Sequence, residues 1–217
     1  MFGSLKRTDR PLFITFEGTE GSGKSLHARM LVERLRAHGL PVCATHEPGG
    51  TPLGDQLRQL VLVRDEVQVV ARAEALLMCT SRTQLVDQVI QPALARGEVV
   101  VSDRFADSTL VYQGAGRGLD MQALVSVISF ATAGLQPDMT LLLDLPVEIG
   151  LARKHTQQAG WNRFEAEALA FHSRVRAGYH ALAQSEPRRW ACFDGTKPMD
   201  ALAEEIWRAV AARMGLT

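Results

Sequence analysis

The chain contains 217 residues, of which 46% are hydrophobic and 22% are charged, a balance typical of one globular domain with a sizeable core. Lys plus Arg and Asp plus Glu both number 24, and this zero net charge argues against a bulk electrostatic grip on nucleic acid. No apolar run reaches the ~18 residues that a membrane span needs, so we expect neither nucleic acid nor a membrane as a partner.

The polar residues 1–10 lack the apolar centre of a signal peptide, which predicts a loose N-terminal tail on a cytoplasmic protein. Cys43, Cys79 and Cys192 are far apart and form neither a disulfide framework nor a zinc-binding spacing. We expect each of them to be a small buried hydrophobic residue in a reducing compartment. Because no Pro/Ser-rich linker interrupts the chain, residues 1–217 are predicted to form a single domain.

Five short apolar runs predict β-strands, and helical patterns separate them. The runs are Leu12–Phe16, Val42–His46, Val99–Ser102, Thr140–Leu145 and Trp190–Phe193. Several are apolar without alternation, which is typical of strands buried on both faces. The sequence therefore predicts an α/β fold with a five-stranded parallel sheet and helices on both faces.

The stretch Gly18-Thr-Glu-Gly-Ser-Gly-Lys-Ser25 fits the G-x-x-x-x-G-K-[ST] pattern at every position, between a predicted strand and a predicted helix. Its glycines let the backbone wrap closely, so that the loop N–H groups and the helix N-terminus face an anion. Lys24 supplies a charge for the β- and γ-phosphates, and Ser25 supplies a hydroxyl for Mg²⁺. This pattern predicts a P-loop NTPase fold. Its ATP-binding residues are Gly18, Thr19, Glu20, Gly21, Ser22, Gly23, Lys24 and Ser25.

Three segments between the strands have helical patterns. Apolar residues recur at helical spacing in Leu26–His38, and the same pattern runs from Phe164 to Val175. In Leu119–Thr132 they cover most of the circumference, which predicts a helix buried either in the core or in a subunit interface. His27 and His172 belong to no metal-ligand cluster and are expected on helix surfaces.

Glu47 and Asp103 follow predicted strands, at the sheet edge where ligands of parallel sheets bind. A carboxylate at Asp103 suits Mg²⁺, directly or through water, and the adjacent Arg104 suits a phosphoryl group. Taken alone, the Pro/Gly-rich stretch at Glu47 indicates only a turn. Arg58 and Arg82 lie in helical patterns, where a lone arginine is usually solvated.

Together these pieces resemble the thymidylate kinase family, in its bacterial form, over nearly the whole chain. The matching pieces are Phe16-Glu-Gly-Thr-Glu-Gly-Ser-Gly-Lys-Ser25, Glu47-Pro-Gly-Gly-Thr51, Arg82, Asp103-Arg-Phe105, Ser108-Thr109, Tyr112-Gln-Gly114 and Leu143-Asp-Leu145. The phosphate loop is common to many NTPases, but its combination with the other pieces is much more specific. The resemblance implies a nucleoside monophosphate kinase that makes dTDP from dTMP and Mg·ATP for dTTP synthesis. It also implies a homodimer that uses the helix Leu119–Thr132.

Carried over position by position, the resemblance assigns catalytic roles to Lys24, Asp103, Arg104 and Arg153, and Mg²⁺ to Ser25 and Asp103. The residues implied to bind dTMP are Glu20, Glu47, Arg58, Met78, Arg82, Arg104, Ser108, Thr109, Tyr112 and Gln113. Among them the three arginines surround the acceptor phosphate and Glu20 lies near the sugar hydroxyl, while Thr109 and Gln113 face the thymine edge. Tyr112 packs against the deoxyribose, and residues from about 150 to 165 form a flexible lid.

Met78 departs from the family pattern, which has a Phe that stacks on thymine at this position. Methionine offers a polarizable sulfur but no flat ring. Either Met78 fills the same space, or the base preference is shifted. The second possibility leaves open a related deoxynucleotide kinase as an alternative function.

The predicted lid also departs from the family, because it is poor in arginine and the phosphate loop carries none at Gly21 and Ser22. His155 aligns roughly with the lid arginine that neutralises the transferring phosphoryl group, and the loss of such a residue can cost orders of magnitude in rate. Lys154 or Arg153 could compensate. We therefore hypothesise a turnover lower than is usual for the family, and the alternative is a kinase-like nucleotide-binding protein of weak activity.

Overall fold

The computed structural model describes residues 11–62, 68–157, 164 and 167–216. They contain a five-stranded sheet with the strand order β2-β3-β1-β4-β5. All the strand pairs are parallel. The strands are β1 (Phe13–Glu17), β2 (Val42–His46), β3 (Val99–Asp103), β4 (Met139–Asp144) and β5 (Trp190–Asp194). The predicted fold class is confirmed, and each strand begins and ends within one residue of its prediction.

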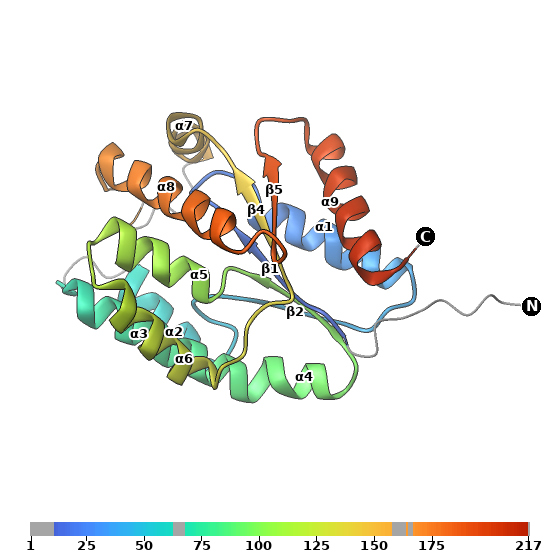
Figure 1. Ribbon diagram of the computed structural model, residues 1–217, viewed down its shortest axis with the longest axis horizontal. Helices are drawn as coiled ribbons and strands as arrows, with labels where there is room; N and C mark the ends of the chain where they lie inside the picture. The colour runs from blue at the N-terminus through green and yellow to red at the C-terminus, as the bar shows by residue number, and fades with distance from the viewer. Residues whose placement is uncertain (1–10, 63–67, 158–163, 165–166, 217) are drawn as a thin grey trace, which may run out of the picture.

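Helices cover both faces of this sheet (Figure 1). The first part of the chain contributes α1 (Lys24–Ala37), α2 (Pro52–Leu62), α3 (Ala71–Leu85), η1 (Val86–Ile90) and α4 (Gln91–Ala95). The later part contributes α5 (Ala106–Thr109), η2 (Leu110–Gly116), α6 (Met121–Thr132), α7 (Val147–Gln157), α8 (Leu169–Ser185) and α9 (Met199–Met214). Helices α1 and α9 pack on one face, whereas η1, α4 and α8 pack on the other.

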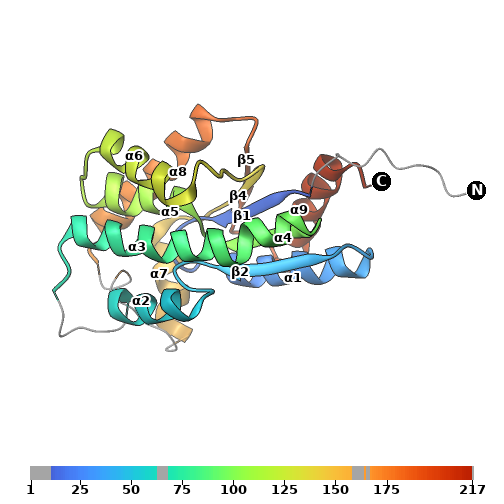
Figure 2. The same ribbon diagram turned by 90° about the horizontal axis from the view of Figure 1, so that it is seen from below.

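Alternate side chains of the buried strands point to the two faces, as the pleat of a strand requires. Ile14 and Val101 enter the core cluster under α1 and α9, whereas Phe13 and Val100 enter the cluster under η1 and α4. The apolar runs without alternation are explained by these two cores. Figure 2 shows that α3 and α4, joined by the wider turn of η1, continue along one line beside the sheet.

Helix α6 buries only one of its sides. Leu124 and Ile128 pack against Ala75 and Cys79 of α3, but Phe130 is 89% exposed. The prediction of a helix buried in the core is therefore only half correct. Its other side carries exposed apolar residues, and the prediction that this side forms a subunit interface remains a prediction.

Some of the sequence predictions were wrong. Helix α8 begins at Leu169, so Phe164 lies before the helix, where its ring stacks on that of Phe171. His27 and His172 are buried rather than on helix surfaces, and Cys192 is exposed rather than buried. The predicted tail 1–10 and the lid residues 158–163 and 165–166 lie outside the described residues.

Candidate active site

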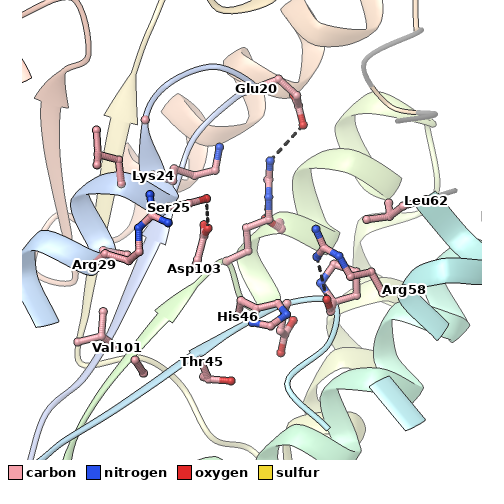
Figure 3. Close-up of a pocket in the computed structure, with 18 of the residues that line it drawn as sticks. Glu20, Lys24, Ser25, Arg29, Thr45, His46, Arg58, Leu62, Val101 and Asp103 are labelled. Atoms are coloured by element: carbon pink, nitrogen blue, oxygen red, sulfur yellow. Dashed lines mark hydrogen bonds and ion pairs between the residues drawn. The ribbon is translucent and has the colours of Figure 1, made fainter. Parts of the chain in front are cut away.

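An open cavity of about 1040 Å³ lies beyond the carboxyl ends of β1, β2 and β3. Figure 3 shows Lys24 and Ser25 of α1 on one side, Arg58 of α2 on the other, and Asp103 beside Ser25. The predicted site residues that line it are Glu20, Gly21, Gly23, Lys24, Ser25, Glu47, Arg58, Met78, Arg82, Asp103, Arg104, Ser108, Thr109, Tyr112 and Gln113. Those that do not line it are Gly18, Thr19, Ser22 and Arg153.

The phosphate loop has the backbone that its glycines were expected to allow. Gly18, Gly21 and Gly23 have φ angles of 144°, 71° and 89°, in the region that favours glycine. Helix α1 begins directly after Gly23, and no described side chain caps its first turn. The backbone N–H groups of such a helix end provide a binding site for an anion.

The Lys24 side chain is 7% exposed and lies inside the loop. Its Nζ donates to the carbonyl oxygen of Thr19 over 2.7 Å and to Ser22 Oγ over 3.3 Å. Burial, and then the positive charge of Arg104, lower the pKa of Lys24 to about 8. A bound phosphate would favour the ammonium form again, because an opposite charge stabilises a buried cation.

Ser25 and Asp103 form the best candidate metal site in the described residues. The Ser25 hydroxyl donates to Asp103 Oδ2, while Asp103 Oδ1 is buried without a hydrogen-bond partner. A hydroxyl and a carboxylate are hard oxygen ligands, which Mg²⁺ prefers. One protein carboxylate is enough for a Mg²⁺ ion that also binds substrate phosphates, so the residues present fit the expected cofactor.

Arg58 and Arg104 bring two further positive charges to the cavity lining. Arg58 Nη1 donates to the carbonyl oxygen of Pro48 over 2.9 Å. Burial, and then the charge of Arg104, lower the pKa of Arg58. An anion bound next to both arginines would relieve this repulsion, so their neighbourhood is a candidate anion site.

Glu20 and Tyr112 hold the guanidinium of Arg104 from the phosphate-loop side. Arg104 Nη2 donates to Glu20 Oε1 and to Tyr112 Oη, both over 3.1 Å. Burial opposes the charge on Glu20, but His172, Arg104 and Lys24 hold the pKa of this carboxyl well below its ordinary value. Glu20 is therefore ionised, and it lies where the phosphate loop lines the cavity.

Arg82 is only 2% exposed, so a lone helical arginine is not solvated in this fold. Its Nη2 lies 2.7 Å from Glu47 Oε2 and donates to Thr109 Oγ1 over 2.9 Å. Burial works against the cation, but the Glu47 carboxylate raises the pKa of Arg82. The Glu47 turn is therefore tied to α3 by a buried ion pair.

The far end of the cavity is less polar. Met78 is half-buried against a core cluster that contains Tyr112 and Phe164, and Phe164 also lines the cavity. The Tyr112 and Phe164 rings meet edge to face with centroids 5.5 Å apart. Gln113 Nε2 donates to the buried Glu74 over 2.8 Å, which fixes the orientation of its amide.

The first turns of the predicted lid belong to α7, and there Arg153 points away from the cavity. Its Nη1 donates to the carbonyl oxygens of Gly195, over 3.1 Å, and of Gly21, over 3.4 Å. Lys154, the next residue, lines the cavity beside the phosphate loop. In this position Lys154, rather than Arg153, is the α7 cation that faces the substrate space.

Sequence reasoning assigned no role to several buried polar residues around the site. Glu17, Glu74, His172 and Tyr179 contact predicted site residues from β1, α3 and α8. Glu17 is a charged residue at the end of an apolar strand and belongs to the piece Phe16–Ser25 on which the resemblance rests, but neither signal assigned it a role. For Tyr179 the sequence gives none, because its hydrogen-bond partner Glu17 is 162 residues away in the chain.

Comparison with known proteins gives one consistent family. A family model described as thymidylate kinase matches residues 16–206. A thymidylate kinase of Thermomicrobium roseum is 48% identical over 198 residues, covering 91% of this chain and 93% of the relative. One of Solidesulfovibrio magneticus is 49% identical over 205 residues, covering 92% and 98%. A thymidylate kinase of Deinococcus radiodurans is 48% identical over 202 residues, covering 93% and 97%.

Proposed function

The chain belongs to the thymidylate kinase family, and we propose that its cavity transfers the γ-phosphoryl group of ATP to dTMP, which yields dTDP. The protein is an ATP:dTMP phosphotransferase. One observation carries the assignment of the cavity: Lys24 of the phosphate loop and the arginines Arg58 and Arg104 line one space, with Arg58 on the side opposite Lys24 (Figure 3). In this proposal the donor phosphates lie at the loop and the acceptor phosphate lies at the two arginines.

On the donor side, the loop from Gly18 to Ser25 binds the ATP phosphates through its N–H groups and the start of α1. Lys24 neutralises charge on the β- and γ-phosphates. The Ser25 hydroxyl and the Asp103 carboxylate would hold Mg²⁺, directly or through water. When bound, Mg²⁺ supplies positive charge that neutralises the phosphate oxygens.

On the acceptor side, Arg58 and Arg104 bind the phosphate of dTMP. The attacking atom is an oxygen of this phosphate, which is already an anion, so no general base is needed. Catalysis then consists of alignment and charge neutralisation, which is typical of phosphoryl transfer. Arg82 assists through Glu47 and Thr109, to which it is bound in the core of the site.

The nucleoside lies between Glu20, Tyr112 and the less polar end of the cavity. Glu20 accepts from the sugar hydroxyl, and Tyr112 packs against the deoxyribose, where a ribose 2′-hydroxyl would crowd. Thr109 and Gln113 face the thymine edge, and Met78 fills the position of the missing ring. The relatives named thymidylate kinase do not favour a shifted base preference.

The lid, from about residue 150 to 165, closes over ATP in this proposal. Lys154 is the described lid cation in the cavity lining, and it supplies the charge that a lid arginine would give to the transferring phosphoryl group. Arg153 acts through its contacts with Gly21 and Gly195. This arrangement supports a low turnover rather than a binding protein without activity.

We further propose a homodimer in the cytoplasm, formed by one domain per chain. The exposed apolar side chains of α6, with Val125 at 52% and Phe130 at 89% exposure, support the interface. Cys43, Cys79 and Cys192 are free thiols, which suits a reducing compartment. No helix in the described residues is long and apolar enough to cross a membrane.

A panel of nucleoside monophosphates tests the proposed function. Purified protein is incubated with Mg·ATP and each of dTMP, dUMP, dCMP and dGMP, and the diphosphate product is quantified. We expect dTDP as the preferred product. Equal rates with dUMP, dCMP or dGMP would refute the thymidylate assignment, and binding without any diphosphate product would refute the kinase activity.

A further inference from the structure

The last residue of β1, Glu17, is a fully buried carboxylate that the proposed reaction does not use. Three donors surround it. The Phe105 N–H donates to Glu17 Oε1 over 2.9 Å, and the hydroxyls of Ser108 and Tyr179 donate to Oε2 over 2.6 and 2.7 Å. A buried carboxylate is costly unless it is hydrogen-bonded, and these three donors hold Glu17 in one orientation.

These donors surround Arg104, whose backbone is unusual. Arg104 has a φ angle of 72°, which residues other than glycine adopt only where their surroundings hold them firmly. Its own N–H donates to the carbonyl oxygen of Phe16 over 2.9 Å, and the next N–H, of Phe105, donates to Glu17. The last two residues of β1 therefore hold both amides of the turn that presents Arg104.

The Arg104 side chain is connected to the same carboxylate. Its Nη1 donates to Ser108 Oγ over 3.1 Å and to Tyr179 Oη over 3.3 Å. A guanidinium can only donate and an ionised carboxylate can only accept, so the direction of each bond is fixed. Each hydroxyl accepts from Arg104 and donates to Glu17.

The other amino group of Arg104 is held in a similar way. Its Nη2 donates to Glu20 directly, and to Tyr112 Oη, which in turn donates to Glu20 Oε1 over 2.6 Å. Two carboxylates, Glu17 and Glu20, thus hold the two ends of one guanidinium. Of the two, only Glu20 lines the cavity.

We propose that Glu17 is a positioning residue that orients Arg104 toward the acceptor phosphate, through the Phe105 amide and the hydroxyls of Ser108 and Tyr179. Neither Glu17 nor Tyr179 is part of the cavity lining, so both act on substrate through Arg104. The inference rests on the proposed function, because it takes the acceptor phosphate as the ligand of Arg104.

The charge of Glu17 is set by groups on three elements. Burial, and then the carboxylate of Asp107 on α5, raise its pKa, and Arg104, Ser108 and Tyr179 of α8 offset part of this rise, so that the pKa of Glu17 is about 7. Measurements at pH 8 therefore keep Glu17 largely ionised. The negative charge of Glu17 also acts on Lys24 of α1, whose pKa it raises against the larger effect of burial.

The test uses the Glu17→Gln variant and two ligands that differ only in the phosphate, dTMP and thymidine. To keep the Phe105 bond, the glutamine must turn its NH₂ group to the two hydroxyls, which then lose the carboxylate as an acceptor. The hydroxyls lie 3.1 Å apart, so only one of them can donate to the other instead. We expect the dissociation constant of dTMP at pH 8, measured by titration calorimetry, to rise about 10- to 100-fold. That of thymidine should stay unchanged, as should the KM of ATP.

Tyr179→Phe keeps the test decisive if Glu17→Gln does not fold. It removes one of the two connecting hydroxyls. The dissociation constant of dTMP should rise by a smaller factor than in Glu17→Gln, and that of thymidine should stay unchanged. Asp138→Asn is the matched control, because Asp138 caps Phe13 at the opposite end of β1, over 2.9 Å. It should leave both dissociation constants unchanged.

A double-mutant cycle with Arg104→Ala supplies the last arm, since coupled residues have non-additive effects. In the Arg104→Ala background, the further substitution Glu17→Gln should leave the dissociation constant of dTMP unchanged. Unchanged dTMP binding in Glu17→Gln, or equal losses for dTMP and thymidine, would overturn the inference. If the wild-type protein itself does not phosphorylate dTMP, the proposed function fails, and this outcome is distinct from the previous two.

Discussion

The phosphate loop and the first turn of α7 touch backbone to backbone at Gly21 and Gly150. A Cβ atom on Gly21 would lie 2.1 Å from the carbonyl oxygen of Gly150, and one on Gly150 would lie 2.3 Å from that of Glu20. Position 21 therefore has no room for a side chain. The loop cannot carry an arginine at this position, so any positive charge that such an arginine would give has to come from another residue.

Gly21→Ala tests this contact. Gly39→Ala is its matched control, because Gly39 has a similar φ of 75° but nothing within 4 Å of an added Cβ. Both variants incur the cost of a left-handed alanine, roughly 1–2 kcal/mol. Only Gly21→Ala also forces the loop away from α7, so we expect its kcat/KM for ATP to fall by about a hundredfold. Equal losses of activity in the two variants would argue against the contact.

Lys154→Ala tests the source of the missing charge. Because Lys154 is the α7 cation in the cavity lining, its removal should lower kcat for dTMP by about tenfold or more, with a smaller effect on both KM values. Arg208→Ala, at an exposed position of α9, should have no effect. An unchanged rate in Lys154→Ala would eliminate Lys154 as the substitute for the lid arginine.

The arginine-poor lid predicts a low turnover even with Lys154 in place. We expect kcat for dTMP at saturating Mg·ATP to lie below the range of ordinary kinases, ~1–100 s⁻¹. Steady-state kinetics of the wild-type protein measure this value directly. A rate constant inside that range would contradict the hypothesis.

Asp103→Asn tests the proposed metal site. The substitution removes the carboxylate beside Ser25, so the Mg²⁺ concentration for half-maximal rate should rise about 10- to 100-fold. Chelation of the metal in the wild-type protein should abolish dTDP formation. Asp200→Asn, at the exposed start of α9, is the control and should keep the wild-type Mg²⁺ dependence. The same dependence in Asp103→Asn would remove Asp103 from the site.

The lowered pKa of Lys24 predicts that activity falls at alkaline pH. Its pKa is lowered to about 8 by burial and by Arg104, so the free protein loses this cation as the pH rises through about 8. The value of kcat/KM for ATP reports the free protein and should fall above that pH. Lys24→Arg, whose guanidinium stays charged, should lack this fall although it is less active. An identical alkaline fall in Lys24→Arg would assign the titration to another group.

Local patterns were sufficient to predict the fold. Continuous runs such as Val99-Val-Val101 have no polar side to leave in water, so they predict strands with a core on each face, and both cores are present. The phosphate loop was predicted because its pattern is contiguous. The carboxyl ends of parallel strands meet at one edge of a sheet, so the sequence also predicted that Glu47, Asp103 and the loop line one cavity.

Side-chain partners from distant parts of the chain could not be predicted in this way. Arg82 alone indicated a solvated residue, but Glu47, 35 residues earlier, pairs with it and allows its burial. His172 was expected on a surface, yet α8 places its Nδ1 3.5 Å from Glu20. Arg153 and Lys154 are adjacent in sequence, and only the orientation of α7 decides which of them faces the cavity.

A crystal structure with dTMP, Mg²⁺ and a non-hydrolysable ATP analogue measures the central claim most directly. The analogue phosphates should lie in the loop from Gly18 to Ser25, with the dTMP phosphate within hydrogen-bond distance of Arg58 and Arg104. The γ-phosphate should then be in line with an oxygen of dTMP. A dTMP phosphate bound away from both arginines would contradict the account.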